Sequence, residues 1–193
     1  MAQLFKLRKW GAQVANSRHR RARAFTIIEL IVVISIILVL AGLVLATSSY
    51  VHNKGARSRA EVEIAAFSAA LENYKADNGV YVTATGVDAK AGINMSGYQA
   101  ATLILYENLT GDFNHDRSPD SGKVSYMTFV PNQLSPADQS QAVTFIKDPF
   151  GNSYGYSTAN QSDPNKGYNP TFDLWSTVGL TSGTNQSQWV KNW

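Results

Sequence analysis

The sequence has 193 residues, of which 44% are hydrophobic and 16% are charged, and its formal net charge is +3. Residues 1–24 contain seven of the 17 basic residues and no acidic one, which leaves 10 bases against 14 acids in residues 25–193. Because the basic excess is confined to one short segment, the composition argues against a basic DNA-binding domain. The sequence contains no cysteine, which excludes disulfides, thiol catalysis and cysteine-ligated metals. Its three histidines are far apart, which argues against a histidine-rich zinc site.

Residues 25–46 form an apolar run in which Glu29 is the only charged residue. As a helix this run spans roughly 30 Å, about the thickness of a bilayer's hydrocarbon core. A secretory signal peptide would have a shorter apolar stretch, followed by a small-residue cleavage site. The run therefore predicts a membrane-spanning helix. Because the larger basic cluster precedes it, we expect a cytoplasmic N-terminus and an exported C-terminal part.

A helical pattern continues through residues 56–77, where apolar side chains recur at spacings of three and four. The stripe consists of Ala60, Ile64, Phe67, Leu71 and Tyr74. Opposite charges spaced to pair on the exposed face are Arg57–Glu61, Arg59–Glu63 and Glu72–Lys75. Gly79 is expected to end the helix in a left-handed conformation. One helix from about Thr26 to Asp77 would be on the order of 75 Å long, too long to be buried in one small domain, so it needs partners.

After Gly79 the sequence predicts a variable loop over residues 80–123, with a short helix at 101–109. The β-branched and aromatic segment 124–130 predicts a strand, and segment 142–146 predicts either a strand or a short helix. Residues 148–152 predict a turn, and two more strands are expected at 154–156 and 171–176. The expected fold class is α+β: a long N-terminal spine helix followed by a small antiparallel sheet domain.

The junction before the apolar run has a recognisable order of residues. A basic cluster ends in the small residue Ala24, and Phe25-Thr26-Ile27-Ile28-Glu29 follows. This order resembles the class III signal of type IV prepilins and type II secretion pseudopilins, although that signal has Gly where this chain has Ala24. The resemblance implies that prepilin peptidase removes residues 1–24 by cutting between Ala24 and Phe25, and then methylates the new amine of Phe25. It also implies a pilin-like fold.

Glu29 has its own physical argument, because a carboxylate inside a membrane helix is costly unless a cation lies beside it. The resemblance implies that this cation is the free N-terminal amine of a neighbouring subunit, which is largely protonated at neutral pH. The pair would form only when two subunits are correctly staggered, so Glu29 would set the register of a polymer. The alternative is a lone interfacial glutamate in a simple membrane anchor.

Three further segments, 65–81, 148–156 and 172–179, resemble motifs of the major, G-type pseudopilins. In that group a C-terminal loop binds calcium, but this chain has Leu180-Thr181 where an acidic residue is expected, so we assign no metal ligands. Oxygen-bearing side chains at alternate positions of residues 112–120 resemble the start of an EF-hand loop, but Arg117 and Lys123 break the pattern. We expect a solvated loop there, with calcium as the alternative. We expect Trp175, Trp189 and Trp193 to pack the tail onto the sheet instead.

The resemblance divides the chain into four parts. These are a leader (1–24), the transmembrane and assembly half of the spine (25–49), its amphipathic half (50–79), and a variable loop with the β domain (80–193). It implies a structural subunit of a secretion pseudopilus, anchored by a single pass in a bacterial inner membrane and assembled with copies of itself and other pseudopilins on a membrane platform. The alternatives are a type IV pilin of a surface, adhesion or DNA-uptake pilus, and a membrane-anchored ligand-binding domain. No enzymatic activity and no nucleic-acid partner are expected.

Overall fold

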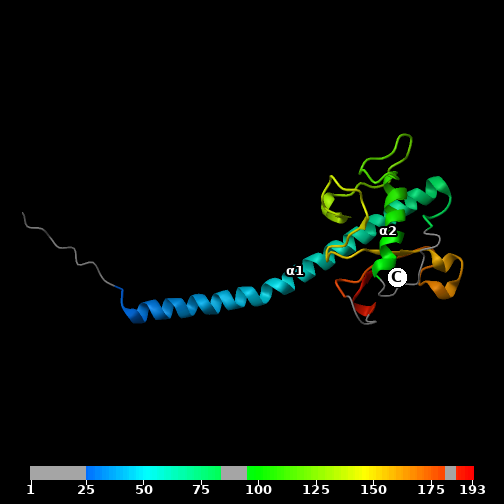
Figure 1. Ribbon diagram of the computed structural model, residues 1–193. Coiled ribbons are helices and arrows are strands. Elements are labelled where there is room, and N and C mark those ends of the chain that lie inside the picture. Colours follow the sequence, from blue (N-terminus) through cyan, green and yellow to red (C-terminus); the bar gives the residue numbers. More distant parts are fainter. Residues whose placement is uncertain (1–24, 84–94, 181–185) are drawn as a thin grey trace, which may run out of the picture. The chain divides into compact units, whose positions relative to one another are not determined.

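The structure is a computed structural model that describes residues 25–83, 95–180 and 186–193. The expected long helix is confirmed: α1 runs as one helix from Ile27 to Asn78, over 52 residues (Figure 1). The chain divides into two compact units, Met1–Ala46 and Thr47–Trp193. In the first unit, residues 25–46 are all exposed. By length and composition, α1 can cross a membrane.

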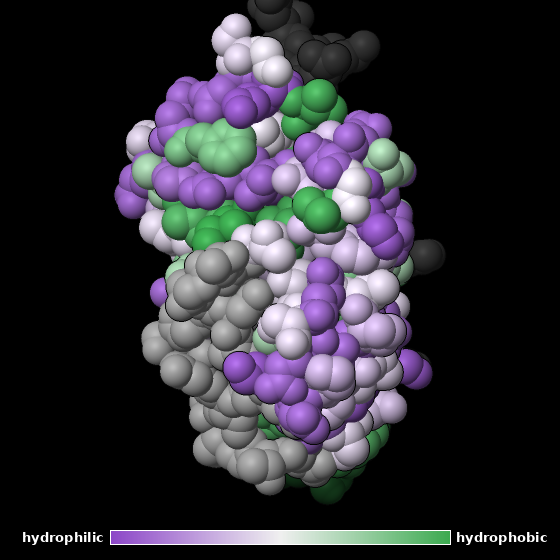
Figure 2. Space-filling view, turned by 90° about the vertical axis from the view of Figure 1, so that its right-hand side faces the viewer, coloured by the Kyte–Doolittle hydropathy of each residue, from purple (hydrophilic) through white to green (hydrophobic). Residues whose placement is uncertain are grey.

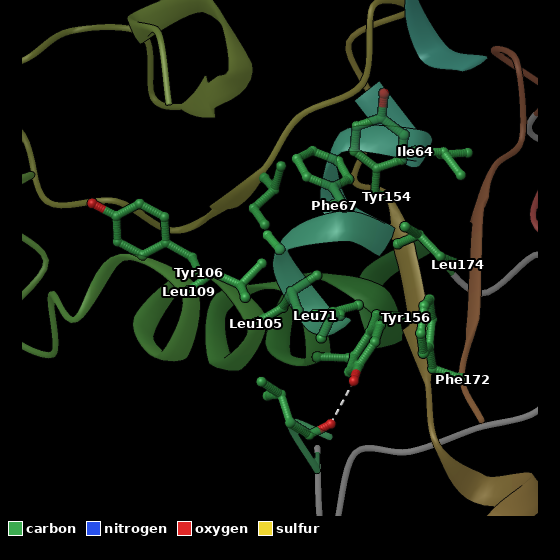
Figure 3. Packing of buried hydrophobic residues seen from close by; sticks show 14 of the residues in the cluster. Ile64, Phe67, Leu71, Leu105, Tyr106, Leu109, Tyr154, Tyr156, Phe172 and Leu174 are labelled. Atoms are coloured by element: carbon green, nitrogen blue, oxygen red, sulfur yellow. Dashed lines mark hydrogen bonds between the residues drawn. The ribbon is translucent and has the colours of Figure 1, made fainter. Parts of the chain in front are cut away.

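Among the described residues, the core of the second unit is formed by two helices packed against residues of the strands and their flanking segments. The predicted stripe of α1 is buried at Ala60, Ile64, Phe67 and Leu71. Helix α2 (Met95–Thr110) begins earlier than the predicted helix at 101–109 and buries its own apolar face. The members of that face are Ala101, Leu105, Tyr106 and Leu109. Figure 3 shows side chains of α1 and α2 facing the aromatic rings of the sheet, which close the core.

In the part of the chain that the structure describes, five short strands form two antiparallel sheets. In the first sheet, β1 (Leu134–Ser135) pairs with β2 (Phe145–Ile146). The second sheet has the order β3 (Gly155–Ser157), β4 (Asp173–Ser176) and β5 (Val190–Lys191). Tyr156 faces Leu174 across its first pair, and Trp175 faces Lys191 across the second. Short 3₁₀ helices among the described residues lie between or beside these strands: Pro131–Gln133, Ala159–Gln161, Pro164–Lys166 and Gln186–Gln188.

Two local chain-reversal signals in this unit are confirmed. Gly79 has a φ of +78° and its amide donates to the Lys75 carbonyl at 2.7 Å, which ends α1 as expected. The turn at residues 148–152 is closed by the amide of Asp148, which donates to the Asn152 carbonyl at 2.7 Å. The predicted strands at 154–156 and 171–176 are present as β3 and β4, shifted by one or two residues. Segment 142–146 contains the strand β2.

The predicted strand at residues 124–130 is wrong. The amides of Tyr126 and Met127 both donate to the Leu109 carbonyl, at 2.8 and 3.1 Å, so this segment closes the end of α2 instead of joining a sheet. Only the middle of the segment packs on the core: Tyr126, Met127 and Phe129 are partly buried, whereas Val124 and Val130 are exposed. The Phe129 ring lies 5.7 Å from that of Phe67 on α1 and 5.6 Å from that of Tyr106 on α2, so helices and not a neighbouring strand provide this burial.

Candidate processing and assembly site

The start of α1 is a capping box built from Thr26 and Glu29. The Thr26 hydroxyl donates to Glu29 Oε2 at 2.8 Å, and the Thr26 amide donates to the same oxygen at 2.9 Å. In return, the Glu29 amide donates to the Thr26 hydroxyl oxygen at 3.2 Å. This reciprocal arrangement satisfies amides that would otherwise lack a partner at the first turn of a helix.

Phe25 lies immediately before this cap, outside the helix, with 81% of its surface exposed. With Thr26 as the cap, α1 begins two residues after Phe25, which the sequence analysis places on the C-terminal side of the cleaved bond. Ala24 and the rest of the leader, residues 1–24, lie outside the described residues.

The helix surface after the cap is continuously apolar. From Ile27 to Leu45 its large aliphatic side chains are about half exposed or more, and no described residue covers them. On the second unit, by contrast, the exposed apolar residues are scattered. They include Val80, Phe113, Val124 and Val130. Figure 2 shows one face of this unit, where hydrophobic residues form small separate patches among hydrophilic ones. Of these two surfaces, only the apolar surface of α1 from Ile27 to Leu45 is large enough to require lipid or other helices around it.

In the second unit, Glu63 departs from its predicted place on the exposed face of α1. Its ion pair with Arg59 is present at 3.2 Å, but the residue is only 8% exposed. The Tyr154 hydroxyl donates to its other carboxylate oxygen at 2.7 Å. Burial, followed by the bond to Glu63, raises the pKa of Tyr154 far above its usual value, so the phenol stays a donor. Tyr154 is too distant in sequence for helical periodicity to have revealed this contact.

Of the other two predicted pairs, Arg57–Glu61 forms directly at the helix surface and Glu72–Lys75 does not. Arg57 contacts Glu61 at 3.5 Å. The Tyr81 hydroxyl bridges Glu72 and Lys75. It donates to Glu72 at 2.8 Å and accepts from Lys75 at 3.2 Å.

Asp148 is a second buried carboxylate that the sequence indicated only as part of a turn. Its Oδ1 accepts the amides of Phe150 and Asn152, at 3.0 and 2.8 Å, and its Oδ2 accepts the Ser176 hydroxyl at 2.6 Å. These bonds tie the turn at 148–152 to strand β4. Burial raises the pKa of Asp148, and the hydrogen bonds lower it by less.

The EF-hand-like segment at residues 112–120 is only partly the solvated loop that was expected, because Asp112 is fully buried. The Asp112 carboxylate accepts the Tyr106 hydroxyl at 2.5 Å and the amides of Asp116 and Arg117 at 3.1 and 2.7 Å. The Arg117 guanidinium donates to the carbonyls of Pro136, Asp138 and Gln141. Within the described residues, His, Cys, Asp and Glu form no group of three or more suited to holding a metal ion.

The expected packing of the tail is confirmed. Trp175 and Trp189 are 0% and 3% exposed, and their rings stack with centroids 6.5 Å apart. The ring of Trp193 meets that of Trp175 edge-on at 5.9 Å. Arg57 of α1 also donates to the carbonyls of Gln188 and Trp189, which joins the tail to the helix.

Comparison with known proteins bears on the N-terminal segment. Residues 19–45 match the family model described as the prokaryotic N-terminal methylation motif. No curated protein matches the chain. The match contains Phe25, the capping box and most of the exposed apolar helix. It indicates a type IV pilin-like protein that is processed by prepilin peptidase, and it points to a structural subunit rather than an enzyme. The motif supports a place for this chain in the type IV pilin and pseudopilin superfamily.

Proposed function

We propose that this protein is a filament subunit of a type II secretion pseudopilus. The observation that carries the proposal is the uncovered apolar surface of α1 with a single carboxylate, Glu29, in its first turn. Such a surface is stable in a bilayer before assembly and against the same surface of other subunits afterwards. The match of residues 19–45 to the N-terminal methylation motif supports the proposal, because it covers the start of this surface.

Maturation comes first in the proposed sequence of events. Prepilin peptidase cuts between Ala24 and Phe25 and methylates the Phe25 amine. Before the cut, the chain is a single-pass protein of the bacterial inner membrane, with a cytoplasmic N-terminus set by the basic leader. The second unit then lies on the periplasmic side.

Assembly follows through packing of the helices and one ion pair. Contact between apolar helices does not define a register, because lipid tails are equally apolar. Glu29 defines it by pairing with the Phe25 amine of a neighbouring subunit. The other proposed partners are minor pseudopilins and the inner-membrane assembly platform.

The assignment to secretion rests on the segments that resemble G-type pseudopilins, whereas a type IV pilin of a surface or uptake pilus would have the same spine. Deletion of the gene distinguishes the two. Loss of exported proteins from the culture medium with unchanged surface filaments supports a pseudopilin, and the reverse result supports a pilin.

The subunit function is tested by Glu29→Gln, which keeps the size and polarity of the side chain but removes its charge. We expect normal insertion and processing but a low yield of sheared filaments. Intact mass should give a mature chain beginning at a methylated Phe25, and Ala24→Arg should leave the precursor uncut. A filament yield of Glu29→Gln close to that of the unmodified protein would favour a membrane-anchored domain, which has no need of the charge.

A further inference from the structure

We propose that a groove beside α1 binds a phospholipid of the membrane that α1 crosses, with Lys54 on the lipid phosphate. The groove lies within the second unit and is separate from the processing and assembly site. The proposal goes beyond the filament function. It depends on the anchoring of α1 in a membrane, but not on the pairing of Glu29 or on the kind of filament.

The groove has a volume of about 390 Å³ and is lined by one face of α1 and by two turns of the domain. Its lining residues are Tyr50, Asn53, Lys54 and Arg57 of α1, Phe150 and Val178. The four from α1 stand at positions i, i+3, i+4 and i+7, so they share one face of the helix. Three residues later the same face becomes the buried stripe: Ala60 is 0% exposed, whereas Tyr50 is 70% exposed. The groove is therefore the place where this face of α1 emerges from the core of the unit.

Lys54 supplies the groove with a positive charge that no carboxylate compensates. Between the apolar run and Glu61 the chain has three Lys or Arg residues and no acid. Two of them reach acids further along α1: Arg57 contacts Glu61 at 3.5 Å, and Arg59 contacts Glu63 at 3.2 Å. Lys54 forms no ion pair with any described residue. An ammonium group donates three hydrogen bonds, so Lys54 is suited to an anion such as a phosphate.

The position of the groove along α1 identifies which phosphate is within reach. Tyr50 and Lys54 lie four and eight residues after Ala46, the last residue of the apolar run, or about 6 and 12 Å along the helix axis. The headgroup region of a bilayer extends about 5–8 Å beyond the hydrocarbon core on each side. Helical side chains tilt toward the N-terminus, and a lysine side chain is long and flexible, which brings the Lys54 ammonium within reach of that region. Tyrosine is enriched at the same depth, which fits Tyr50.

The apolar wall of the groove is held by a strained turn. The Leu180 amide donates to the Thr177 carbonyl at 3.0 Å, and the two residues between them, Val178 and Gly179, have φ values of +51° and +81°. Gly, Asn and Asp are the usual residues at such positions, and a β-branched residue there is strained. Strain of this kind is concentrated at binding sites. Here it places an apolar side chain beside Phe150, where the first methylenes of a lipid chain can pack.

The test measures lipid retention by the full, unassembled chain. The protein is inserted into vesicles with equal amounts of phosphatidylglycerol and phosphatidylcholine and is then extracted with a mild detergent. Native mass spectrometry gives the fraction of chains that keep a phospholipid and identifies its headgroup. We expect the unmodified chain to retain the anionic phosphatidylglycerol preferentially, and Lys54→Gln to lower the retained fraction several-fold. Because Lys54 is exposed and lacks an ion pair among the described residues, its substitution should leave the unfolding midpoint unchanged.

The matched control moves the charge out of the groove without removing it. In the double variant His52→Lys/Lys54→Gln the lysine stands two residues earlier, roughly 200° around the helix. His52 is exposed and does not line the groove. We expect lipid retention to stay as low as in Lys54→Gln. Recovery of retention in the double variant would overturn the proposal, because any charge near the membrane would then suffice.

Other results would also overturn the lipid site. Equal retention by Lys54→Gln and the unmodified chain is one, and if that variant also assembles poorly, the groove holds a neighbouring subunit instead. Displacement of the lipid by a large excess of inorganic phosphate is another, since it would indicate a site for a free anion. A chain recovered outside the membrane fraction would refute the anchoring in the proposed function. Equal retention by an inserted chain refutes the lipid site alone, so the two failures are distinguishable.

Discussion

The buried hydrogen bond from the Tyr154 hydroxyl to Glu63 joins the residue before strand β3 to helix α1. Removing the hydroxyl in Tyr154→Phe leaves one Glu63 oxygen buried with no replacement donor, which costs about 1–3 kcal/mol of unfolding free energy. We expect a lower midpoint in denaturant unfolding of the full chain in detergent. Tyr50→Phe, at a residue that is 70% exposed, is the control and should leave the midpoint unchanged. Equal midpoints for the two variants would show that Glu63 finds another donor.

Because Asp148 is buried, we expect the free energy of unfolding to depend on pH. Burial, with a smaller contribution from the Glu63 carboxylate, raises the pKa of Asp148 in the folded chain above its ordinary value of 3.8. The folded state therefore holds its proton more tightly than the unfolded state. This contribution to stability is complete below pH 3.8 and is lost as the pH rises through the folded-state pKa.

The variant Asp148→Asn keeps the shape and the acceptor for the amides of Phe150 and Asn152, but it does not titrate. We expect the unfolding midpoint of the unmodified protein, relative to that of Asp148→Asn, to decrease as the pH rises above 3.8. A constant difference across that range would mean that Asp148 has the same pKa in the folded and unfolded chains.

Among the elements, α1, β3 and β4 were predicted from their local patterns, whereas β1 and β5 were not, and the β-like pattern at residues 124–130 forms no strand. The periodicity of α1 and the glycine at its end determine a helix through neighbouring residues, so its bounds agree within one residue. Strands β1 and β5 contain two residues each, too few to give an alternating pattern. Their pairing depends on partners elsewhere in the chain.

The candidate site was likewise predicted where its signal is local, and buried residues elsewhere were missed where their partners are not evident from the sequence. The order from Ala24 to Glu29 pointed to the junction, and Thr26 and Glu29 form a capping box whose spacing is visible in the sequence. The burial of Glu63 was missed because its donor, Tyr154, lies 91 residues away. The burial of Asp112 was missed because its alternating acidic neighbours resemble a loop in solvent, while Tyr106 comes from the preceding helix.

The Arg117 side chain attaches the loop at residues 112–120 to the segment 136–141. Its guanidinium joins this loop to three carbonyls in the segment 136–141. Arg117→Ala should lower the unfolding midpoint and speed proteolytic cleavage within both segments. Arg117→Lys should not restore either property, because one ammonium lacks the fork of donors that a guanidinium provides. Lys166→Ala, at an exposed surface pair, is the control. Full rescue by lysine would show that charge alone holds the loop.

For the whole molecule, the choice between aromatic packing and calcium is settled by melting. Trp189 is buried against Trp175, so Trp189→Ala should cost about 3–5 kcal/mol and lower the midpoint by several degrees. A chelator should leave the midpoint of the full chain unchanged. A large decrease with chelator, reversed by added calcium, would show instead that an ion stabilises the domain.

The bonds from Arg57 to the carbonyls of Gln188 and Trp189 join residues more than 130 positions apart in the chain. A helix forms through neighbours, whereas a contact of this kind waits until the ends of a long loop meet, which slows folding. A chain whose apolar helix is already in the bilayer while its C-terminal domain is still open is therefore the expected early species during biogenesis. We therefore expect insertion and domain closure to be separate events in time, with the second completing the subunit.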